Sequence, residues 1–509
     1  MNTSVTKACA LLLAVLILGG LAGPVSAEWK NPKAQPHPKA KPQRRTAAES
    51  LPPLPLPATP LRRSERKRQP SPPNLVGMVN FSERRFVQKN GKRVAASAFP
   101  TTVIDIERLI SYANSRLNIR YRYVPIQLAK FSWDPRTLPL LYVTGWTPMP
   151  KLSNETIVSL QRYLYDGGTL VVHAQCGREE FRTTAVREIK RIFPNRQLSA
   201  IDTDSPLFSA YYPIKKMRFR KDSKPFQSMK PYLEAIYLGC RPAIIFSPID
   251  LNCGWDVAKR PIEGGVLYHQ DDAIKLGVNI ITSVLANMQY ARAWGVGKIY
   301  HQQGKPSGDQ LVIGQVVHNG DWDPTNHGLP NLMKYIAKNT TLKVQFKRQP
   351  VELGSEKLFK YPVLYMTGLR DFKLTKAEVA RLRKFLLGGG VLIADSAAGR
   401  KAFDVAFRRE LKRAMPNHKL ARIAADSQLY QMPYAIQTVT YSDMVKATSP
   451  SLNAPTLEGV KIDGQLGVIY SSLGLGNGWE QLGFAYNRGY ADADAIRIGV
   501  NALAYAMTH

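Results

Sequence analysis

The feature that most constrains the fold of this chain is an internal repeat. The segment Leu160–Phe181 (LQRYLYDGGTLVVHAQCGREEF) returns as Leu382–Phe403 (LRKFLLGGGVLIADSAAGRKAF), at an offset of 222 positions (382 minus 160). Other motifs recur in the same order: LPLLYVTG and YPVLYMTG, the Gly-Trp pairs at 254–255 and 478–479, and KLGVN and RIGVN. A period this long indicates duplicated whole domains, because solenoid units span only roughly 20 to 50 residues.

The pattern within each copy alternates strands with helices. Short apolar runs of the buried-strand type precede a helix that Ser153 or Thr375 would cap, and glycines follow that helix. A second apolar strand then leads into an Arg-rich amphipathic helix. This alternation predicts two tandem α/β domains with mainly parallel sheets and helices on both faces. We expect them at 75–292 and 309–509, joined by a linker over 293–308.

The first 27 residues have the pattern of a secretory signal peptide. Lys7 is followed by an apolar run over 10–21, and Val25-Ser26-Ala27 places small residues before a cut at Glu28. The run is too short for a confident membrane span, although an uncleaved anchor is the alternative. The sequence therefore predicts an exported protein, periplasmic or secreted, of bacterial type.

Residues 28–74 form a Pro-rich basic segment, which we expect to be a disordered linker. The whole chain carries a formal net charge of +32. This charge favours an anionic cell-envelope polymer or a membrane surface as partner, while export argues against nucleic acid. For the linker itself, a solvated tether without a partner is the favoured interpretation, and no oligomeric state is predicted.

Several motifs resemble a known family, the domain of unknown function 4159. They are VHNGDWDP over 317–324, the "YP-LY-TG" strand and the "GG-L-AD" strand. The resemblance covers both copies, although the first has Val79-Asn-Phe-Ser in place of the His-Asn-Gly-Asp-Trp motif. That family resembles class I glutamine amidotransferase-like domains with a flavodoxin-like sheet. No activity is generally credited to it, so the resemblance implies a fold and almost no chemistry.

Cys176 is the candidate nucleophile of the first copy. An amidotransferase-like fold would place its nucleophile on a tight elbow after the "GG" strand, and Cys176 follows that strand with His173 as a candidate base. This predicts a cysteine-dependent hydrolase or amidase. Against it, the second copy has Ala398 opposite Cys176 and Asp395 opposite His173, and the G-x-C-x-G elbow is incomplete. A buried or disulfide-bonded cysteine is therefore the favoured interpretation.

Signal cleavage would leave three cysteines, Cys176, Cys240 and Cys253. An odd number requires at least one that is free or paired between chains. Cys253 can pair with Cys176 or with Cys240, and the sequence leaves both pairings open. Because no C-x-x-C or H-x-x-x-H spacing occurs, we expect no metal site and no cofactor.

The second copy offers a set of candidate ligand-binding residues. Carboxylates and a histidine follow strand ends, where they could bind a cation or the hydroxyls of a sugar, with two tryptophans as stacking faces. We expect Asp395 to end the third strand and Asp426 to follow the fourth. Turn formation by Asp and Asn is the favoured explanation of these residues, with ligand binding as the alternative. The set comprises His318, Asp321, Trp322, Asp323, Asp395, Asp426 and Trp479.

The leading hypothesis is an exported, non-catalytic envelope binding or structural protein. The alternatives are a cysteine hydrolase using Cys176, and an electrostatic binder of anionic envelope polymers.

Overall fold

The computed structural model describes residues 71–79, 86–89, 91–95, 104–128, 132–256, 264–294, 310–481 and 483–508. The predicted signal peptide, the linker up to residue 70, and residues 295–308 of the second linker lie outside the described residues. Residues 71–509 cluster as one unit that contains both repeats.

The first repeat is built on a seven-stranded sheet with the order β4-β1-β5-β6-β11-β10-β7. Strands β4, β1, β5, β6 and β11 pair in parallel, whereas β10 pairs antiparallel with both β11 and β7. The sheet is therefore mixed and mainly parallel, as the alternating pattern predicts. Its strands are β1 (Asn74–Val79), β4 (Arg122–Ile126), β5 (Leu140–Gly145), β6 (Thr169–Ala174), β7 (Ser199–Ala200), β10 (Glu234–Leu238) and β11 (Arg241–Ser247).

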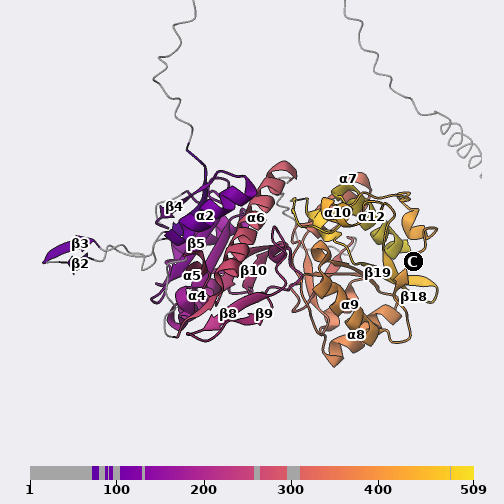
Figure 1. The fold of residues 1–509 in the computed structure, drawn as a ribbon. Helices are drawn as coiled ribbons and strands as arrows, with labels where there is room; N and C mark the ends of the chain where they lie inside the picture. Colours follow the sequence, from indigo (N-terminus) through magenta and orange to yellow (C-terminus); the bar gives the residue numbers. More distant parts are fainter. Residues whose placement is uncertain are drawn as a thin grey trace, which may run out of the picture. The chain divides into compact units, whose positions relative to one another are not determined.

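Helices cover both faces of this sheet (Figure 1). One apolar cluster joins one sheet face to α2 (Ile104–Leu117), α5 (Asn252–Trp255) and α6 (Gln270–Trp294). Another joins the opposite face to α3 (Asn154–Tyr165) and α4 (Glu179–Ile192). Smaller elements complete the repeat: the hairpin β2 (Phe86–Lys89) and β3 (Lys92–Ala95), a three-stranded sheet of β8 (Met217–Lys221), β9 (Gln227–Met229) and β12 (Val266–Tyr268), and the 3-10 helices η2 (Gln175–Gly177) and η3 (Pro206–Phe208).

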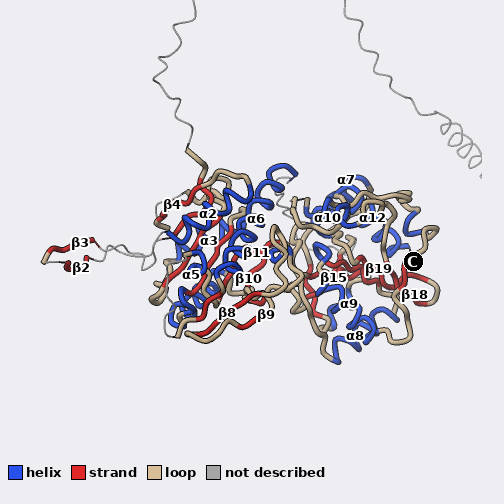
Figure 2. Tube along the Cα trace, viewed as in Figure 1, coloured by secondary structure: helices blue, strands red, loops and turns tan. Residues whose placement is uncertain are grey.

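The second repeat has the same strand order, β14-β13-β15-β16-β19-β18-β17. Figure 2 shows α7, α10 and α12 on one side of β15 and β19, with α9 and α8 on the other. Its elements are β13 (Ile313–Val317), α7 (Gly328–Asn339), β14 (Gln349–Glu352), η4 (Glu356–Lys360), β15 (Val363–Gly368), α8 (Lys376–Leu387), β16 (Val391–Ser396), η5 (Ala397–Gly399), α9 (Lys401–Ala414), β17 (Ala421–Arg422), η6 (Gln428–Tyr430), α10 (Asp443–Thr448), β18 (Glu458–Ile462), β19 (Gln465–Ser471), α11 (Gly476–Glu480) and α12 (Asp492–Thr508).

Strand β14 corrects one expectation, because it makes β16 the fourth strand of the second repeat and β17 the fifth. The segment QPVE has one buried residue and lies at the sheet edge. An edge strand with a single inward side chain leaves no apolar run for a sequence pattern to detect.

The predicted helix boundaries are confirmed by their side chains. Ser153 caps α3 by accepting a hydrogen bond from the Thr156 amide, and Thr375 forms a full capping box with Glu378. At the "GG" motif of the first repeat, Gly167 has a φ of +113°. A Cβ on Gly168 would lie 2.2 Å from the Tyr163 ring. Glycine is therefore required at 167 by the backbone conformation and at 168 by the close ring contact.

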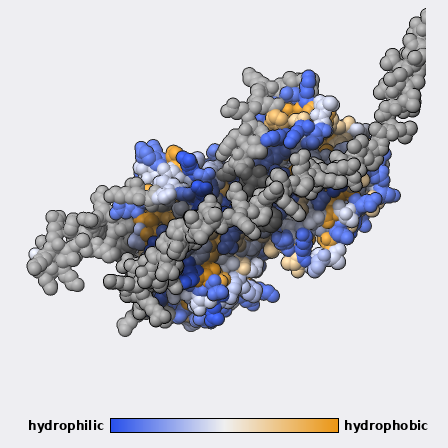
Figure 3. All heavy atoms as spheres, turned by 90° about the horizontal axis from the view of Figure 1, so that it is seen from above, coloured by the Kyte–Doolittle hydropathy of each residue, from blue (hydrophilic) through white to orange (hydrophobic). Residues whose placement is uncertain are grey.

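The described surface seen in Figure 3 is mostly hydrophilic, with separate apolar patches. Within the described part of the chain, the search for a membrane-crossing helix finds none of sufficient length and apolarity.

Candidate functional site at the strand ends

Both repeats make the same elbow between a strand and a helix. In the first, β6 passes through η2 into α4, with Cys176 at a φ of +51°. In the second, β16 passes through η5 into α9, with Ala398 at the same φ of +51°. A positive φ is strained for a residue other than glycine and often marks a functional position. Because Ala398 has no reactive group, the strained elbow is a property of the repeat fold and not evidence of chemistry.

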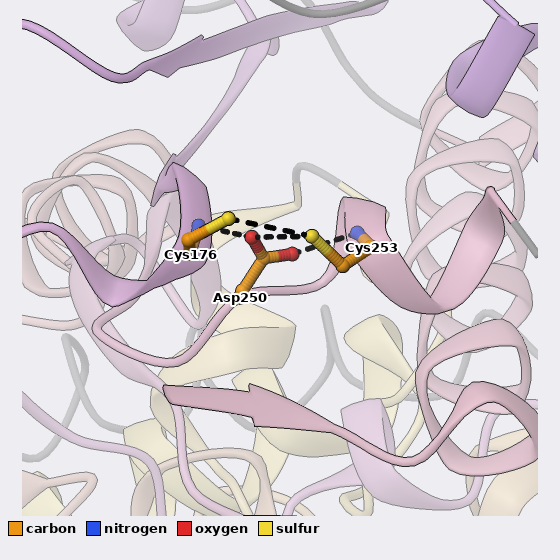
Figure 4. Close-up of side chains that lie close together, drawn as sticks. All are labelled: Cys176, Asp250 and Cys253. Atoms are coloured by element: carbon orange, nitrogen blue, oxygen red, sulfur yellow. Dashed lines mark hydrogen bonds between the residues drawn. The ribbon is translucent and has the colours of Figure 1, made fainter. Parts of the chain in front are cut away.

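Three polar side chains meet at the elbow of the first repeat (Figure 4). The Cys176 Sγ lies 3.6 Å from the Cys253 Sγ, which in turn lies 3.2 Å from the Asp250 Oδ2. The Asp250 carboxylate also accepts hydrogen bonds from the backbone N–H groups of Cys176 and Cys253. Asp250 is fully buried, so its carboxylate ties the elbow of β6 to the start of α5.

This arrangement can support two kinds of thiol chemistry. Oxidation would need the two sulfur atoms to approach by about 1.5 Å, since a disulfide bond is about 2.0 Å long. Alternatively, two thiolates and a carboxylate are ligand types that zinc accepts, and the three ligand atoms lie within 4.8 Å of one another. The hydrogen bond with Cys176, burial and the Asp250 charge all raise the pKa of the Cys253 thiol. The neutral thiol is thus favoured at Cys253, which opposes a nucleophilic role for this thiol.

The predicted base, His173, is fully buried. Its Nε2 lies 2.5 Å from the Tyr142 hydroxyl oxygen, and its ring packs edge-on against Trp255. Cys176 itself is 3% exposed. A substrate carbonyl therefore has no route to this thiol without movement of the elbow.

Cys240 lies elsewhere, with its Sγ 3.0 Å from the Asn477 side-chain nitrogen. Burial raises the pKa of the Cys240 thiol to about 12. Of the two disulfide pairings that the sequence leaves open, the geometry brings Cys176 and Cys253 together.

The sequence analysis did not identify Asp250 as a site residue. Its signal was present as an aspartate three residues before Cys253, at the turn that starts α5. Its partner Cys176 is 74 positions away along the chain, so only the pairing of β6 with β11 reveals the contact.

In the second repeat, Asp395 occupies the position of His173. Its Oδ1 accepts a hydrogen bond from the Tyr365 hydroxyl at 2.7 Å, and its Oδ2 accepts from the amides of Leu475 and Gly476. Burial raises the pKa of the Asp395 carboxyl. Trp479 packs beside Tyr365 and donates its indole N–H to the Ala495 carbonyl at 2.8 Å. Asp395 and Trp479 thus lie together in the interior, and neither presents a stacking or binding face to solvent.

His318 packs against the rings of Phe372 and Phe403. Its Nδ1 accepts from the Gly320 amide at 3.0 Å, and its Nε2 lies 2.9 Å from the Thr367 carbonyl. This pattern requires a neutral ring protonated on Nε2. Burial lowers the pKa of His318 to about 4, which agrees with that form.

The remaining predicted ligand-binding residues form one small group and one isolated position. Asp321 lies 3.6 Å from Arg196, Asp323 pairs with Arg348, and the Arg348 guanidinium lies over Trp322. Asp426 is exposed on the loop after β17. Strand β17 is three strands away from β16, which carries Asp395. The two strands are therefore about 14 Å apart across the sheet, and Asp426 lies far from Asp395. The seven candidates do not converge on one site.

An open cavity of about 420 Å³ lies at the carboxyl ends of β16 and β19, where flavodoxin-like folds bind ligands. Its basic lining residues are Arg400, Lys401 and Arg488. None of these was predicted as a site residue. The Gly-Arg pair that follows the elbow in both copies was their only sequence signal.

The family model for a domain of unknown function (DUF4159) matches residues 100–285 and 312–507, one match per repeat. The search of curated proteins returns no match.

Proposed function

The chain belongs to the DUF4159 family in two tandem copies, and from this premise we propose that it is an exported, non-catalytic protein that binds an anionic partner in the cell envelope. The observation that carries the non-catalytic part is the burial of Cys176. This is the only cysteine at either elbow, and it is 3% exposed against a second thiol and a carboxylate.

The elbow itself does not argue for catalysis. A cysteine nucleophile needs a favoured thiolate and a base within hydrogen-bond reach. At this elbow a carboxylate lies beside the thiol pair, and the candidate base His173 is engaged by Tyr142. The second repeat keeps the elbow and replaces the cysteine with Ala398.

Thiol labelling of the reduced, native chain tests this proposal. We expect Cys253, which is partly exposed, to react first with a maleimide, and Cys176 and Cys240 to react only on unfolding. Cys240 serves as the internal control for a buried thiol.

Fast stoichiometric labelling of Cys176 in the native chain would contradict the proposal. The contradiction would be complete if His173→Phe slowed this labelling while the distant His418→Phe did not. That pattern would identify a His-activated nucleophile and support the cysteine hydrolase.

The anionic partner is inferred from charge. A net charge of +32 attracts polyanions, and the basic segment at 28–74 adds charges outside the two repeats. The signal-peptide pattern of residues 1–27 brings such a chain to the envelope, where acidic polymers are available.

Two measurements test this part. Processing in an exporting bacterial host should give a mature N-terminus at Glu28, and an uncleaved, cytoplasmic chain would contradict export. The purified chain should cosediment with insoluble poly(glycerol phosphate) more weakly as salt rises, because exposed charge contacts are screened. Binding that salt does not weaken would exclude an electrostatic mode, and binding only to anionic vesicles would identify a membrane surface instead.

A further inference from the structure

The cavity at the ends of β16 and β19 contains a buried positive charge. Arg400 is the N-cap residue of α9, lines the cavity and is only 9% exposed. Its guanidinium makes no hydrogen bond or ion pair with any residue in the described part of the chain. Taking a charge out of water is costly unless an opposite charge compensates for it. The position of Arg400 therefore leaves its guanidinium available to an anion that is not part of the polypeptide.

The nearest acids do not supply this compensation. Asp404 lines the cavity, but its carboxylate pairs with Arg408 at 2.8 Å and accepts a hydrogen bond from Tyr470. Asp204 also lines the cavity and is exposed to solvent. For Asp202, burial and the Asp204 charge raise the pKa and the Arg400 charge lowers it, so this carboxylate interacts with Arg400 electrostatically without forming an ion pair.

Other groups around the cavity favour an anion. Helix α9 has 14 residues, and no side chain caps its N-terminus. The free amides and dipole of such a terminus attract negative charge. Lys401 at its first position is exposed, and Arg488 lines the cavity with a single long contact of 3.4 Å to Thr448. Two guanidinium groups and an ammonium group thus face one cavity, whose volume of about 420 Å³ is that of a small-ligand site.

The first repeat provides an internal comparison. Arg178 occupies the position of Arg400, and its guanidinium lies 3.9 Å from the centre of the Trp146 ring. A cation is stabilised over an indole face. The second repeat has Leu369 in place of Trp146, and a leucine cannot hold a cation. The first repeat therefore compensates its arginine internally, whereas the second leaves the guanidinium available to a ligand.

We propose that the cavity beside Arg400, Lys401 and the N-terminus of α9 binds a phosphate group. This proposal rests on the proposed function, which supplies the negative charge of the ligand. It adds the location of the binding site in the second repeat. Arg400 would hold two phosphate oxygens through its planar guanidinium, and the amides of α9 would hold a third. The phosphate can come from a free small molecule or from the end of an envelope polymer, and both present the same group.

Calorimetric titration of the purified chain tests the site, with inorganic phosphate and glycerol phosphate as probes. We expect saturable binding of one phosphate per chain. Arg400→Gln should weaken it by about tenfold or more, which corresponds to the loss of a charge-assisted hydrogen bond. Lys401→Glu reverses a charge on the exposed wall without disturbing the core and should weaken binding similarly. Arg178→Gln, at the matched position of the first repeat, should leave binding unchanged.

Thermal unfolding separates a binding role from a structural one. If the role of Arg400 is to bind phosphate, Arg400→Met should raise the Tm in the absence of phosphate. The same substitution should remove the Tm increase that phosphate causes in the wild type. A lowered Tm in phosphate-free buffer, together with unchanged phosphate affinity, would overturn the proposal.

The two proposals fail differently. Lack of saturable phosphate binding by the wild type overturns the site, even if salt-dependent binding to poly(glycerol phosphate) persists and supports the proposed function. Phosphate binding that depends on Arg400, without any polymer binding, supports the site with a free small molecule as the ligand source. Polymer binding that Lys401→Glu abolishes supports the site with the polymer end as the source.

Discussion

The two repeats share a backbone plan but differ in the side chains at equivalent elbows. In the first, Cys176 and Cys253 lie on either side of Asp250. In the second, the same contact is made by Asn477, whose Oδ1 accepts from the Ala398 amide at 2.6 Å. The difference teaches that the link between the elbow and the start of α5 or α11 is structural in both repeats, and that the thiols of the first are an addition to it.

The buried polar pairs teach the same lesson. Tyr142 contacts His173 in the first repeat, and Tyr365 contacts Asp395 in the second. A tyrosine hydroxyl therefore meets a polar side chain at the end of the central strand in each copy. The polar partner differs in chemical kind, so the feature that the two repeats share is a buried hydrogen bond of the tyrosine.

The largest effect should come from the equivalent tryptophans Trp255 and Trp479, which are 3% and 2% exposed. Substituting either one with Ala should cost about 3–5 kcal/mol, because a large buried ring and its hydrogen bond are lost. Urea unfolding measures the loss, and hydrogen exchange should locate it in the repeat that carries the change. Val158→Ala, on an exposed helix position, is the control. If either Trp→Ala substitution lowered the unfolding free energy by less than about 1 kcal/mol, the two tryptophans would not have equivalent roles in the two cores.

A smaller effect should separate Asp250 from Asn477. Asp250→Ala leaves two backbone N–H groups without an acceptor and should cost about 2 kcal/mol, and Asn477→Ala leaves one and should cost about 1 kcal/mol. Asp250→Asn should restore part of the stability. If the two alanine variants lost the same unfolding free energy, the Asp250 carboxylate would not stabilise the fold through two backbone hydrogen bonds.

The pH dependence should distinguish the second repeat through His318. Its pKa of about 4 in the folded chain lies below the ordinary value of 6.5. Between these values the unfolded chain binds a proton that the folded chain does not, so the unfolding free energy should fall as pH drops from 6.5 to 4. The loss should be about 1–3 kcal/mol, the lower end being favoured because the ring is only partly buried.

Unfolding titrations at several pH values measure this slope. His318→Gln should flatten it within that window, whereas the control His418→Gln should not. A slope that is the same in wild type and His318→Gln would exclude the buried neutral ring.

The smallest stability effect should come from Cys176→Ala, which gives the first repeat the residue of the second. We expect a cost of about 1 kcal/mol or less, because a small side chain is exchanged at an unchanged φ.

Mild oxidation of the wild type should link Cys176 to Cys253, detected by mass spectrometry after digestion. A link between Cys240 and Cys253 instead would contradict the observed proximity of Cys176 and Cys253.

Much of the fold could be predicted from local patterns. The strands, the helices and the caps at Ser153 and Thr375 depend on residues close in the sequence, and the match between the two copies shows the duplication. The elbow at Cys176 was expected only from the resemblance to amidotransferase-like domains. The candidate site was harder to predict. His318 follows β13 and Asp395 lies near the end of β16, as the pattern indicates, but nothing local says that Asp395 and Trp479 are enclosed.

Local periodicity, turn residues and hydrogen-bonding caps are properties of short segments, so the amino-acid order was sufficient for the duplicated α/β plan. The contacts of Asp250 and the position of the Arg400 guanidinium, which forms no ion pair with a described side chain, required the folded chain. The reason is topological: β6 lies beside β11, and β16 lies beside β19, and in each repeat the intervening strands are added outside this pair. Side chains far apart in sequence therefore meet at the strand ends, and whether a charge finds a partner there depends on the packing of both segments.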